Sequence, residues 1–262
     1  MAVFVIAEVG VNHGGDPERA QRLIDVAKEA GADAVKFQMF SSRALWGDDR
    51  IKHLELSRDE LARLHRYCEQ VGIEFMCTPF DVGAVKFLTP LVRRMKVASG
   101  CIGRGELLGA VRATGLPAIL STGMSENTDI ASALSCLGPD VTLLHCTSSY
   151  PCRIEDVNLR AMDTLREEFR HAVGYSDHTP GITIAIAAAA KGATVIEKHL
   201  TLDRGAEGPD HKASIEPVDF RVMVSAIRTV ETALGDGVKA VRDCEVALRR
   251  AWHEPAPPYS PA

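Results

Sequence analysis

The feature that most constrains the fold of this chain is a repeated alternation between short apolar runs and longer amphipathic segments. Apolar runs at residues 3–7, 34–37 and 73–76 are each followed by a segment with helical periodicity, and the same order recurs as far as residue 234. Strands that alternate with helices predict a parallel sheet. Eight such units in 262 residues fit a closed (β/α)8 barrel better than an open doubly wound sheet.

The alternation stops near Gly235 and leaves a short tail. We therefore assign residues 1–235 to a single TIM-barrel domain of the α/β class, and residues 236–262 to a C-terminal tail. Residues 244–252 predict one short helix in this tail. The proline-rich end that follows is expected to be disordered, because it has few apolar residues to bury.

Composition narrows the class of partner. The net charge of −5 gives no bulk attraction to nucleic acid or to an anionic membrane. The longest apolar stretch, residues 184–190, is too short to span a bilayer, and the N-terminus has no basic leader. We therefore expect a cytoplasmic protein that binds neither nucleic acid nor membrane.

The seven cysteines give no sign of a disulfide framework or of a Cys-x-x-Cys motif. Their odd number and mostly apolar contexts predict reduced, packed thiols. Cys77, Cys101 and Cys146 are expected to be packing residues and not nucleophiles, because their spacing supplies no neighbouring base.

Polar residues gather where the predicted strands end. In a barrel of this kind the active site lies at the carboxyl ends of the strands. Two lysines and several hydroxyls at these positions suit a phosphate with an adjacent carboxylate, since lysine supplies charge and hydroxyls donate hydrogen bonds. The strand-end positions are held by Glu8, Lys36, Gln38, Thr78, Lys96, Ser99, Ser121, Thr122, His145, Thr147, Ser148, Ser176, Asp177, His178 and His199.

His178 and His199 each stand just past the end of one of two neighbouring predicted strands. Two imidazoles can hold one divalent metal ion and leave positions open for a carbonyl oxygen or a water. Glu8 could then serve as acid or base beside the metal. A phosphate site next to a polarised carbonyl is consistent with carbon–carbon bond formation.

Each of these residues also has a purely structural interpretation. A lysine at a strand end can form a structural ion pair, and Ser121 can cap the next helix. His145 follows two leucines and can be a hydrogen-bonded core histidine. His13 and His211 fall in predicted loops, where exposure to solvent is the default expectation.

Eight short motifs, in order between residues 3 and 217, resemble the sialic acid synthase family. Any one of them is a weak signal, whereas all eight in order are specific. They are Glu8-Val-Gly-Val-Asn-His-Gly-Gly15, Ala34-Val-Lys-Phe-Gln38, Cys77-Thr-Pro-Phe80, Lys96-Val-Ala-Ser-Gly100, Leu120-Ser-Thr-Gly-Met124, Leu144-His-Cys-Thr-Ser-Ser-Tyr-Pro151, Gly174-Tyr-Ser-Asp-His-Thr179 and Glu197-Lys-His-Leu-Thr201.

The resemblance implies a (β/α)8 enzyme that condenses phosphoenolpyruvate with the open-chain aldehyde of an N-acetylated amino sugar, using Mn²⁺ or Mg²⁺. Water attack then releases phosphate and leaves a 2-keto-3-deoxy sugar acid. Matched by motif, His178 and His199 are the metal ligands, and Glu8 is the carboxylate beside the metal and the reacting carbons. Lys36 and Lys96 match lysines that bind phosphoenolpyruvate. The other matched positions are Thr78, Ser99, Ser121, Ser148 and Ser176 for phosphate and carboxylate, and Gln38, Tyr150 and Asp210 for the acceptor sugar.

The sequence departs from the family pattern in two places. Usual members carry a C-terminal antifreeze-like domain that supplies an arginine to the partner subunit's active site, and the 262 residues leave no room for it. Cys101 stands where members often have an acidic residue that binds acceptor hydroxyls, and a thiol cannot replace a carboxylate's hydrogen bonds. We therefore expect the same reaction on an altered acceptor, in a homodimer or with a separate antifreeze-like domain protein.

The residues alone leave other functions open. A metal-dependent aldolase on the same barrel would also need the imidazole pair. A non-catalytic sugar-phosphate-binding protein would need the lysines and hydroxyls, but not Glu8, His178 and His199 together. A condensing synthase, an alkyl-transferring transferase, uses all of these groups.

Overall fold

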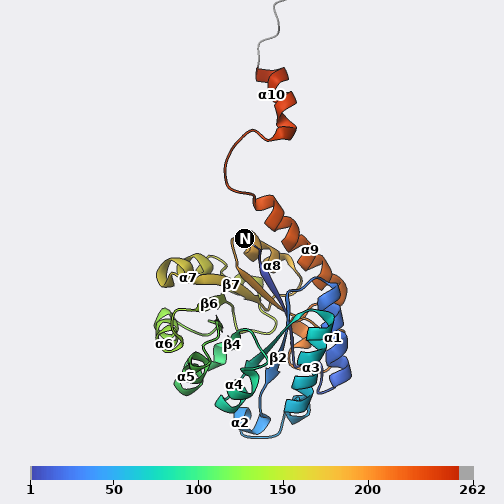
Figure 1. Ribbon diagram of the computed structural model, residues 1–262, viewed down its shortest axis with the longest axis vertical. Helices are drawn as coiled ribbons and strands as arrows, with labels where there is room; N and C mark the ends of the chain where they lie inside the picture. Colours follow the sequence, from blue (N-terminus) through green and yellow to red (C-terminus); the bar gives the residue numbers. More distant parts are fainter. Residues whose placement is uncertain (1, 254–262) are drawn as a thin grey trace, which may run out of the picture.

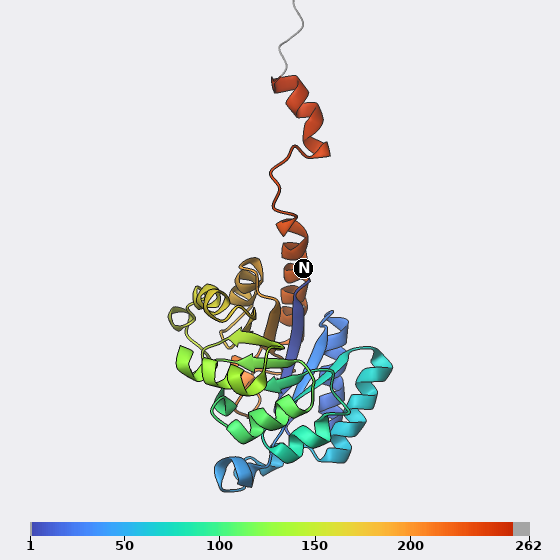
Figure 2. The same cartoon turned by 60° about the vertical axis from the view of Figure 1, so that its left-hand side comes forward.

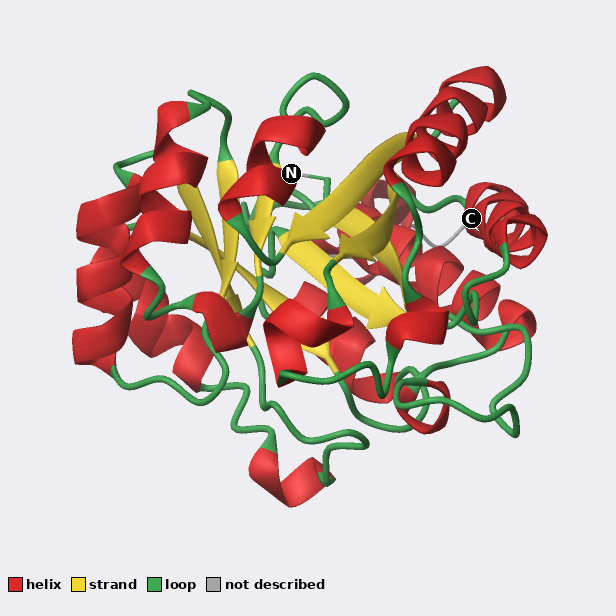
Figure 3. Ribbon diagram, turned by 90° about the horizontal axis from the view of Figure 1, so that it is seen from below, coloured by secondary structure: helices red, strands yellow, loops and turns green. Residues whose placement is uncertain are grey.

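The computed structural model describes residues 2–253. Eight parallel strands form its centre, and helices surround them (Figures 1 and 3). The strands are β1 (Phe4–Gly10), β2 (Ala34–Met39), β3 (Glu74–Pro79), β4 (Met95–Val97), β5 (Ala118–Ser121), β6 (Val141–His145), β7 (Ala172–Asp177) and β8 (Val195–His199).

A helix follows each strand, as the sequence alternation predicts. Local capping explains where several of them begin: Asp16 caps the first helix ahead of Pro17, and Ser57 and Glu60 form a capping box at the start of another. The helices are α1 (Pro17–Glu29), α3 (Arg58–Val71), α4 (Val82–Leu88), α5 (Gly105–Ala113), α6 (Asn127–Leu137), α7 (Ala161–Phe169), α8 (Thr183–Ala190) and α9 (Pro217–Leu234). The loop after β2 adds a short helix, α2 (Ser42–Trp46), that the sequence did not predict.

The strand order closes the sheet almost completely. Hydrogen-bonded neighbours run β3-β2-β1-β8-β7-β6-β5-β4, so the first and last strands of the chain are paired. The two ends of this order, β3 and β4, also lie next to each other. The predicted (β/α)8 barrel is therefore confirmed.

The barrel interior changes from apolar to polar along the strands. Inward-facing residues recur every second position, so each strand contributes first to one layer and then to the next. An apolar layer fills the amino-terminal half, formed by Ile6, Ala34, Met76, Ile119, Leu144 and Val195. Two residues further along five of these strands stand the buried side chains of Glu8, Lys36, Thr78, Ser121 and Glu197. Apolar side chains thus fill the barrel interior at the amino ends of the strands, and polar and charged side chains fill it at their carboxyl ends.

The segment after α9 leaves the barrel. The final helix, α10 (Val246–His253), stands away from the barrel in Figure 2. The sequence predicted this helix at residues 244–252, so its bounds differ by one or two residues. The proline-rich end that the sequence predicts to be disordered lies outside the described residues. Across residues 2–253 no helix combines the length and apolar character that a membrane span requires.

The expectation that His13 and His211 are exposed is wrong. The two side chains are only 1% and 3% exposed. His13 accepts a hydrogen bond from the Gly15 amide through Nδ1 at 2.9 Å, and His211 Nδ1 lies 2.7 Å from Thr201 Oγ1. Both loops fold back over the rim of the barrel, so a loop position here does not mean contact with solvent.

Candidate active site

One cavity of about 400 Å³ opens at the carboxyl ends of the strands. The structure brings all thirteen residues predicted for the site to its lining. They are Glu8, Lys36, Gln38, Thr78, Lys96, Ser99, Ser121, Ser148, Tyr150, Ser176, His178, His199 and Asp210. Cys101, the residue expected to alter acceptor binding, does not line the cavity. Cys101 is 1% exposed and belongs to the hydrophobic core, so it cannot replace an acceptor-binding carboxylate in the cavity.

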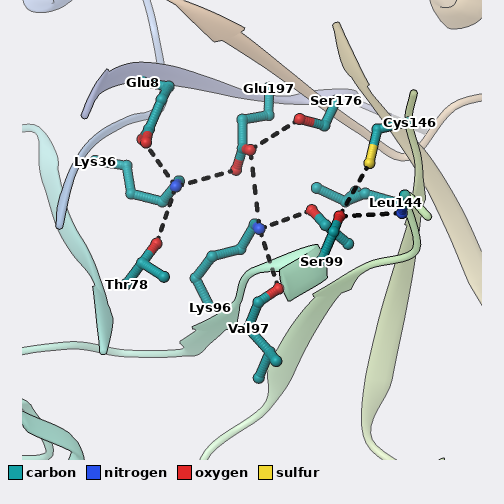
Figure 4. Close-up of polar contacts among 12 residues, drawn as sticks. Glu8, Lys36, Thr78, Lys96, Val97, Ser99, Leu144, Cys146, Ser176 and Glu197 are labelled. Atoms are coloured by element: carbon teal, nitrogen blue, oxygen red, sulfur yellow. Dashed lines mark hydrogen bonds and ion pairs between the residues drawn. The ribbon is translucent and has the colours of Figure 1, made fainter. Parts of the chain in front are cut away.

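Two buried lysines form the floor of the cavity and share one carboxylate (Figure 4). Lys36 Nζ lies 2.8 Å from Glu8 Oε2 and 3.6 Å from Glu197 Oε2. Lys96 Nζ lies 3.9 Å from Glu197 Oε1, which also accepts a hydrogen bond from Ser176 Oγ at 2.9 Å. Glu197 therefore holds both ammonium groups on one side of the cavity.

Burial and pairing set the charges of this cluster. Burial alone would raise the pKa of Glu197, but Lys36 and Lys96 together lower that pKa to about 2. Burial raises the pKa of Glu8, against the opposing effect of Lys36. The pKa of Lys36 is raised because its two carboxylates outweigh its burial, whereas burial lowers the pKa of Lys96. Glu8 is thus the carboxyl of this cluster that is easier to protonate.

Hydroxyl groups extend the two lysines into an anion site. Lys36 donates a hydrogen bond to Thr78 Oγ1 at 3.0 Å, and Lys96 donates one to Ser121 Oγ at 2.7 Å. Ser99 Oγ accepts a hydrogen bond from the Gly123 amide at 3.0 Å. Charged donors and hydroxyls that converge on one space suit a phosphate or a carboxylate.

Gly123 keeps this space open. A Cβ atom there would stand 2.3 Å from Ser148 Oγ and 3.0 Å from both Ser99 Oγ and Cys146 Sγ. Any side chain at position 123 would therefore push these three groups apart. Burial raises the pKa of the Cys146 thiol, which agrees with its expected role in packing.

The two predicted metal ligands lie together, with their ring centroids 5.6 Å apart. His178 Nδ1 lies 2.8 Å from the Thr147 carbonyl oxygen, and burial, reinforced by His199, lowers the pKa of His178 to about 4. A neutral ring that donates from Nδ1 carries its lone pair on Nε2. The Tyr150 ring packs against His178 with centroids 4.1 Å apart.

The donor set at this pair fits a divalent cation that takes part of its coordination from elsewhere. His199 Nδ1 is buried and makes no hydrogen bond to any residue in the described part of the chain, and Asp210 Oδ2 is 3.7 Å away. Within residues 2–253 no set of three or more His, Cys, Asp or Glu side chains has a metal-holding arrangement. Two imidazoles would leave most coordination positions to water and substrate oxygens.

Three polar side chains, those of Glu8, Gln38 and Asp210, converge around Gly10. Gln38 Nε2 donates a hydrogen bond to Glu8 Oε1 at 2.9 Å. A Cβ atom at Gly10 would lie 2.8 Å from Asp210 Oδ2, 3.2 Å from Gln38 Nε2 and 3.3 Å from Glu8 Oε1. The register of β1 against β2 shifts between Glu8 and Gly10, where the backbone takes a φ of +55° that favours glycine. The chain therefore approaches these polar groups as closely as only a glycine allows.

Sequence reasoning missed Glu197, although its motif was recognised. Strand periodicity holds the signal, because Val195, Glu197 and His199 alternate onto the inner face of β8. His145 does not line the cavity; its Nε2 lies 2.7 Å from the Val157 carbonyl oxygen, in agreement with the structural interpretation.

Comparison with known proteins gives consistent matches along the chain. Residues 23–239 match the NeuB family. The chain is 42% identical to N,N'-diacetyllegionaminic acid synthase of Legionella pneumophila, over 95% of this chain and 78% of that protein. It is 40% identical to human N-acetylneuraminate-9-phosphate synthase, over 93% of this chain and 74% of that protein. The structure of N-acetylneuraminic acid (sialic acid) synthetase from Leptospira borgpetersenii in complex with citrate superposes with a TM-score of 0.90 at 36% identity, covering 97% of this chain and 94% of that one.

Proposed function

This chain belongs to the NeuB family, and we propose that it joins phosphoenolpyruvate to the open-chain aldehyde of an amino sugar or related aldose. The products are a 2-keto-3-deoxy acid and phosphate. The protein is then a carbon–carbon bond-forming synthase of carbohydrate biosynthesis. The relatives named above make different sugar acids, which supports the reaction class without selecting one acceptor.

The observation that carries this proposal is the position of Lys36. Its ammonium group pairs with Glu197 on the anion side of the cavity and with Glu8 on the side of Gln38 and Asp210. An anionic substrate bound by the lysines therefore lies next to the group that would handle a proton on the acceptor. A site for a simple sugar phosphate has no need of this juxtaposition.

The imidazoles of His178 and His199 are the groups that would hold Mn²⁺ or Mg²⁺. The ion, when bound, supplies Lewis acidity that polarises the aldehyde. The low pKa of His178 supports this role, because a neutral imidazole is the form that binds metals.

The remaining chemistry falls to the chain's own residues. Lys36, Lys96 and the hydroxyls of Thr78, Ser99, Ser121, Ser148 and Ser176 bind the phosphate and carboxylate of phosphoenolpyruvate. Its C3 forms a bond to the aldehyde carbon, and the aldehyde oxygen takes up a proton. Water adds at C2 and gives up a proton, which balances the proton taken up by the aldehyde oxygen. The C2–O bond to phosphate then breaks with its electron pair going to phosphate, while the C2 hydroxyl becomes the keto group and its proton leaves with the phosphate.

Glu8 is the group that we assign to proton exchange in these steps. Its raised pKa brings a buried carboxyl closer to working pH, as general acid–base catalysis requires. Its Oε1 atom accepts a hydrogen bond from Gln38 Nε2, and Gln38, Tyr150 and Asp210 orient the acceptor.

Location and assembly follow as secondary proposals. All seven cysteines are free thiols, which supports a reducing, cytoplasmic compartment. Val241, Leu248 and Trp252, in and before α10, are 42%, 62% and 82% exposed. Exposed apolar side chains of this kind support a homodimer or binding of a separate antifreeze-like domain protein. Light scattering of the full chain, alone and mixed with such a domain, measures both.

The test of the proposed function is phosphate release from phosphoenolpyruvate with a panel of aldoses, N-acetylmannosamine included. We expect release that requires both an aldose and Mn²⁺ and that stops with a chelator. Carbon–carbon cleavage or exchange without phosphate release would instead assign a metal-dependent aldolase. Binding of phosphoenolpyruvate without turnover of any aldose would assign a sugar-phosphate-binding protein.

A further inference from the structure

Cys146 occupies a position in the barrel where other strands carry polar or charged side chains. Leu144 belongs to the apolar layer of the interior, and Cys146 stands two residues further along, just past the end of β6, as Glu197 stands two residues beyond Val195 on β8. The Cys146 side chain is 5% exposed and lines the cavity. The alternation of the chain therefore places a thiol among the groups that face the substrates, although the reaction proposed above gives it no part.

This thiol is not suited to attack a substrate. Burial raises the pKa of Cys146, and the opposing effects of Ser99 and Lys96 do not offset it. Within residues 2–253 no imidazole and no carboxylate forms a hydrogen bond with the sulfur, so no general base is in place to activate it. Cys146 is therefore a neutral thiol, and a neutral thiol has one weak hydrogen-bond donor to offer.

The ends of three neighbouring strands bring the partners of this thiol together. Ser99 follows β4, Gly123 follows β5 and Cys146 follows β6. Ser99 Oγ accepts a hydrogen bond from the Gly123 amide at 3.0 Å. Cys146 Sγ lies 3.3 Å from the same oxygen (Figure 4). The Ser99 hydroxyl is thus held by two groups of the chain at the point where its side chain lines the cavity.

The hydrogen-bonding capacity of Ser99 makes the direction of the thiol contact decisive. A serine hydroxyl has one hydrogen and two lone pairs. The Gly123 amide uses one lone pair, and Cys146 takes either the other lone pair, as a donor, or the hydrogen, as an acceptor. In the first case the hydroxyl hydrogen is left for a ligand in the cavity. In the second case Ser99 has no hydrogen left to donate to an anion.

A bound anion selects the first arrangement. A hydrogen bond to a charged phosphate or carboxylate oxygen is about twice as strong as one between neutral groups, whereas sulfur is a weak acceptor. Donors that follow one another in the same direction also strengthen each other. The Ser99 hydroxyl therefore gains more by donating to the anion than by donating to the sulfur of Cys146.

We propose that Cys146 is a positioning residue of the anion site: its thiol donates a hydrogen bond to Ser99 Oγ and so directs the Ser99 hydroxyl hydrogen to the bound anion. This inference rests on the proposed function only in naming that anion as phosphoenolpyruvate. It adds a second role to the packing of Cys146, and it predicts that a small side chain with a hydroxyl donor can replace the thiol.

Calorimetric titration of the full chain with inorganic phosphate and with phosphoenolpyruvate, in the absence of an aldose, tests the proposal apart from turnover. Cys146→Ala removes the donor, and we expect both anions to bind about three- to tenfold more weakly. Cys146→Ser restores a donor and should stay within about twofold of the wild type. Thermal unfolding of each variant checks that it is folded.

Cys152→Ala is the matched control. The Cys152 side chain is 2% exposed, and its thiol donates a hydrogen bond to the Arg153 carbonyl oxygen at 3.2 Å, but it does not line the cavity. Loss of this thiol should therefore leave the affinity for both anions unchanged.

A double-mutant cycle shows whether Cys146 acts through Ser99. In a Ser99→Ala background, Cys146→Ala should weaken anion binding no further, because the hydroxyl that the thiol directs is gone. Wild-type affinity in Cys146→Ala, an equal loss in Cys146→Ser, or an undiminished loss in the Ser99→Ala background overturns the proposal. The expected binding pattern without turnover of any aldose would contradict the proposed function alone, and a wild-type chain that binds neither anion would contradict both.

Discussion

Two buried clusters, each of lysines paired with carboxylates, meet on strand β8 and differ in whether their hydrogen bonds and ion pairs are complete. Glu197 faces the barrel interior and is shared by Lys36 and Lys96. The next residue, Lys198, faces the opposite side of the sheet and pairs with Asp177 of β7. The alternation of a single strand thus supplies one cluster to the cavity and the other to the packing between sheet and helices.

The Asp177–Lys198 pair is closed. Both side chains are 0% exposed, and Lys198 Nζ lies 2.8 Å from Asp177 Oδ2. Asp177 Oδ1 accepts hydrogen bonds from the amide and hydroxyl of Thr179 at 2.9 and 2.8 Å, and Lys198 also donates to the Thr179 carbonyl. This network joins the carboxyl ends of β7 and β8 through Asp177 and Thr179, which flank His178, and through Lys198, which precedes His199.

The cavity cluster is open. Lys36 divides its charge between two carboxylates, and its contact with Glu197 is 3.6 Å, longer than a hydrogen bond. His199 Nδ1 makes no hydrogen bond to the described residues. Buried polar groups without full satisfaction are costly unless a ligand completes them. The comparison teaches that completeness of the hydrogen bonds and ion pairs, and not burial or charge, distinguishes the structural cluster from the one to which we assign a function.

The sharpest way to break this comparison is to remove one lysine from each cluster. Lys198→Met should lower the free energy of unfolding by about 3–5 kcal/mol, because it leaves Asp177 buried and unpaired. Lys36→Met should cost less than half as much, since its carboxylate partners line a cavity, yet it should abolish binding of phosphoenolpyruvate. Urea unfolding and calorimetry of ligand binding measure the two effects.

A double variant tests whether the loss of stability comes from the unpaired charge of Asp177. Asp177→Asn combined with Lys198→Met removes both charges and should recover part of the lost stability. Equal destabilisation by Lys198→Met and Lys36→Met would mean that both clusters are structural.

Glu8→Gln sharpens the functional side of the comparison. We expect turnover to fall by about 10²–10⁴-fold, the usual contribution of a general acid or base, while KM for phosphoenolpyruvate changes only a few-fold. Steady-state kinetics separates the two quantities, and Glu106→Gln on the outside of α5 is the control. Near-normal turnover would remove Glu8 from proton exchange and leave it as a counter-charge for Lys36.

The sequence predicted the open cluster well, for a physical reason. Polar residues at the carboxyl ends of parallel strands must meet at one mouth, so the order of strands was enough to bring Glu8, Lys36 and His199 together. Glu197 was missed because it was noted only as part of a motif, and its position on the inner face of β8 was not considered. Inward alternation would have found it.

Other features depend on long-range packing that no local pattern reports. A small apolar cluster joins Val11, Phe40 and Phe80 from the loops after β1, β2 and β3, and His13 of the first of these loops is buried as well. Cys101 was matched by motif to a position that often binds the acceptor, but motif position does not say which way a side chain points in a short helical turn, and Cys101 is buried outside the cavity lining. These outcomes were set by tertiary contacts between loops.

Gly123→Ala tests whether the open cluster needs its empty space. The three atoms nearest to the new Cβ atom belong to the side chains of Ser148, Ser99 and Cys146, which can move, so the fold should remain intact. We expect the affinity for phosphoenolpyruvate to fall about tenfold, or about 1.4 kcal/mol. Gly109→Ala, with nothing within 4 Å on helix α5, is the matched control and should leave the affinity unchanged. Unchanged affinity in Gly123→Ala would place the phosphate away from these hydroxyls.

Glu197→Gln gives the smallest and most discriminating effect. The substitution keeps the shape and the hydrogen bond from Ser176 but removes one negative charge beside both lysines. If Glu197 acts mainly as a counter-charge with which an incoming anion must compete, inorganic phosphate should bind the variant about three- to tenfold more tightly. The corresponding gain in binding free energy is a small part of the roughly 4 kcal/mol by which two unit charges interact at 4 Å near a protein surface. Calorimetric titration with phosphate measures the change, and Glu207→Gln in an exposed loop controls for net charge. Weaker binding would show instead that Glu197 acts by holding the two ammonium groups in place, and the open cluster would then be more rigid than its geometry implies.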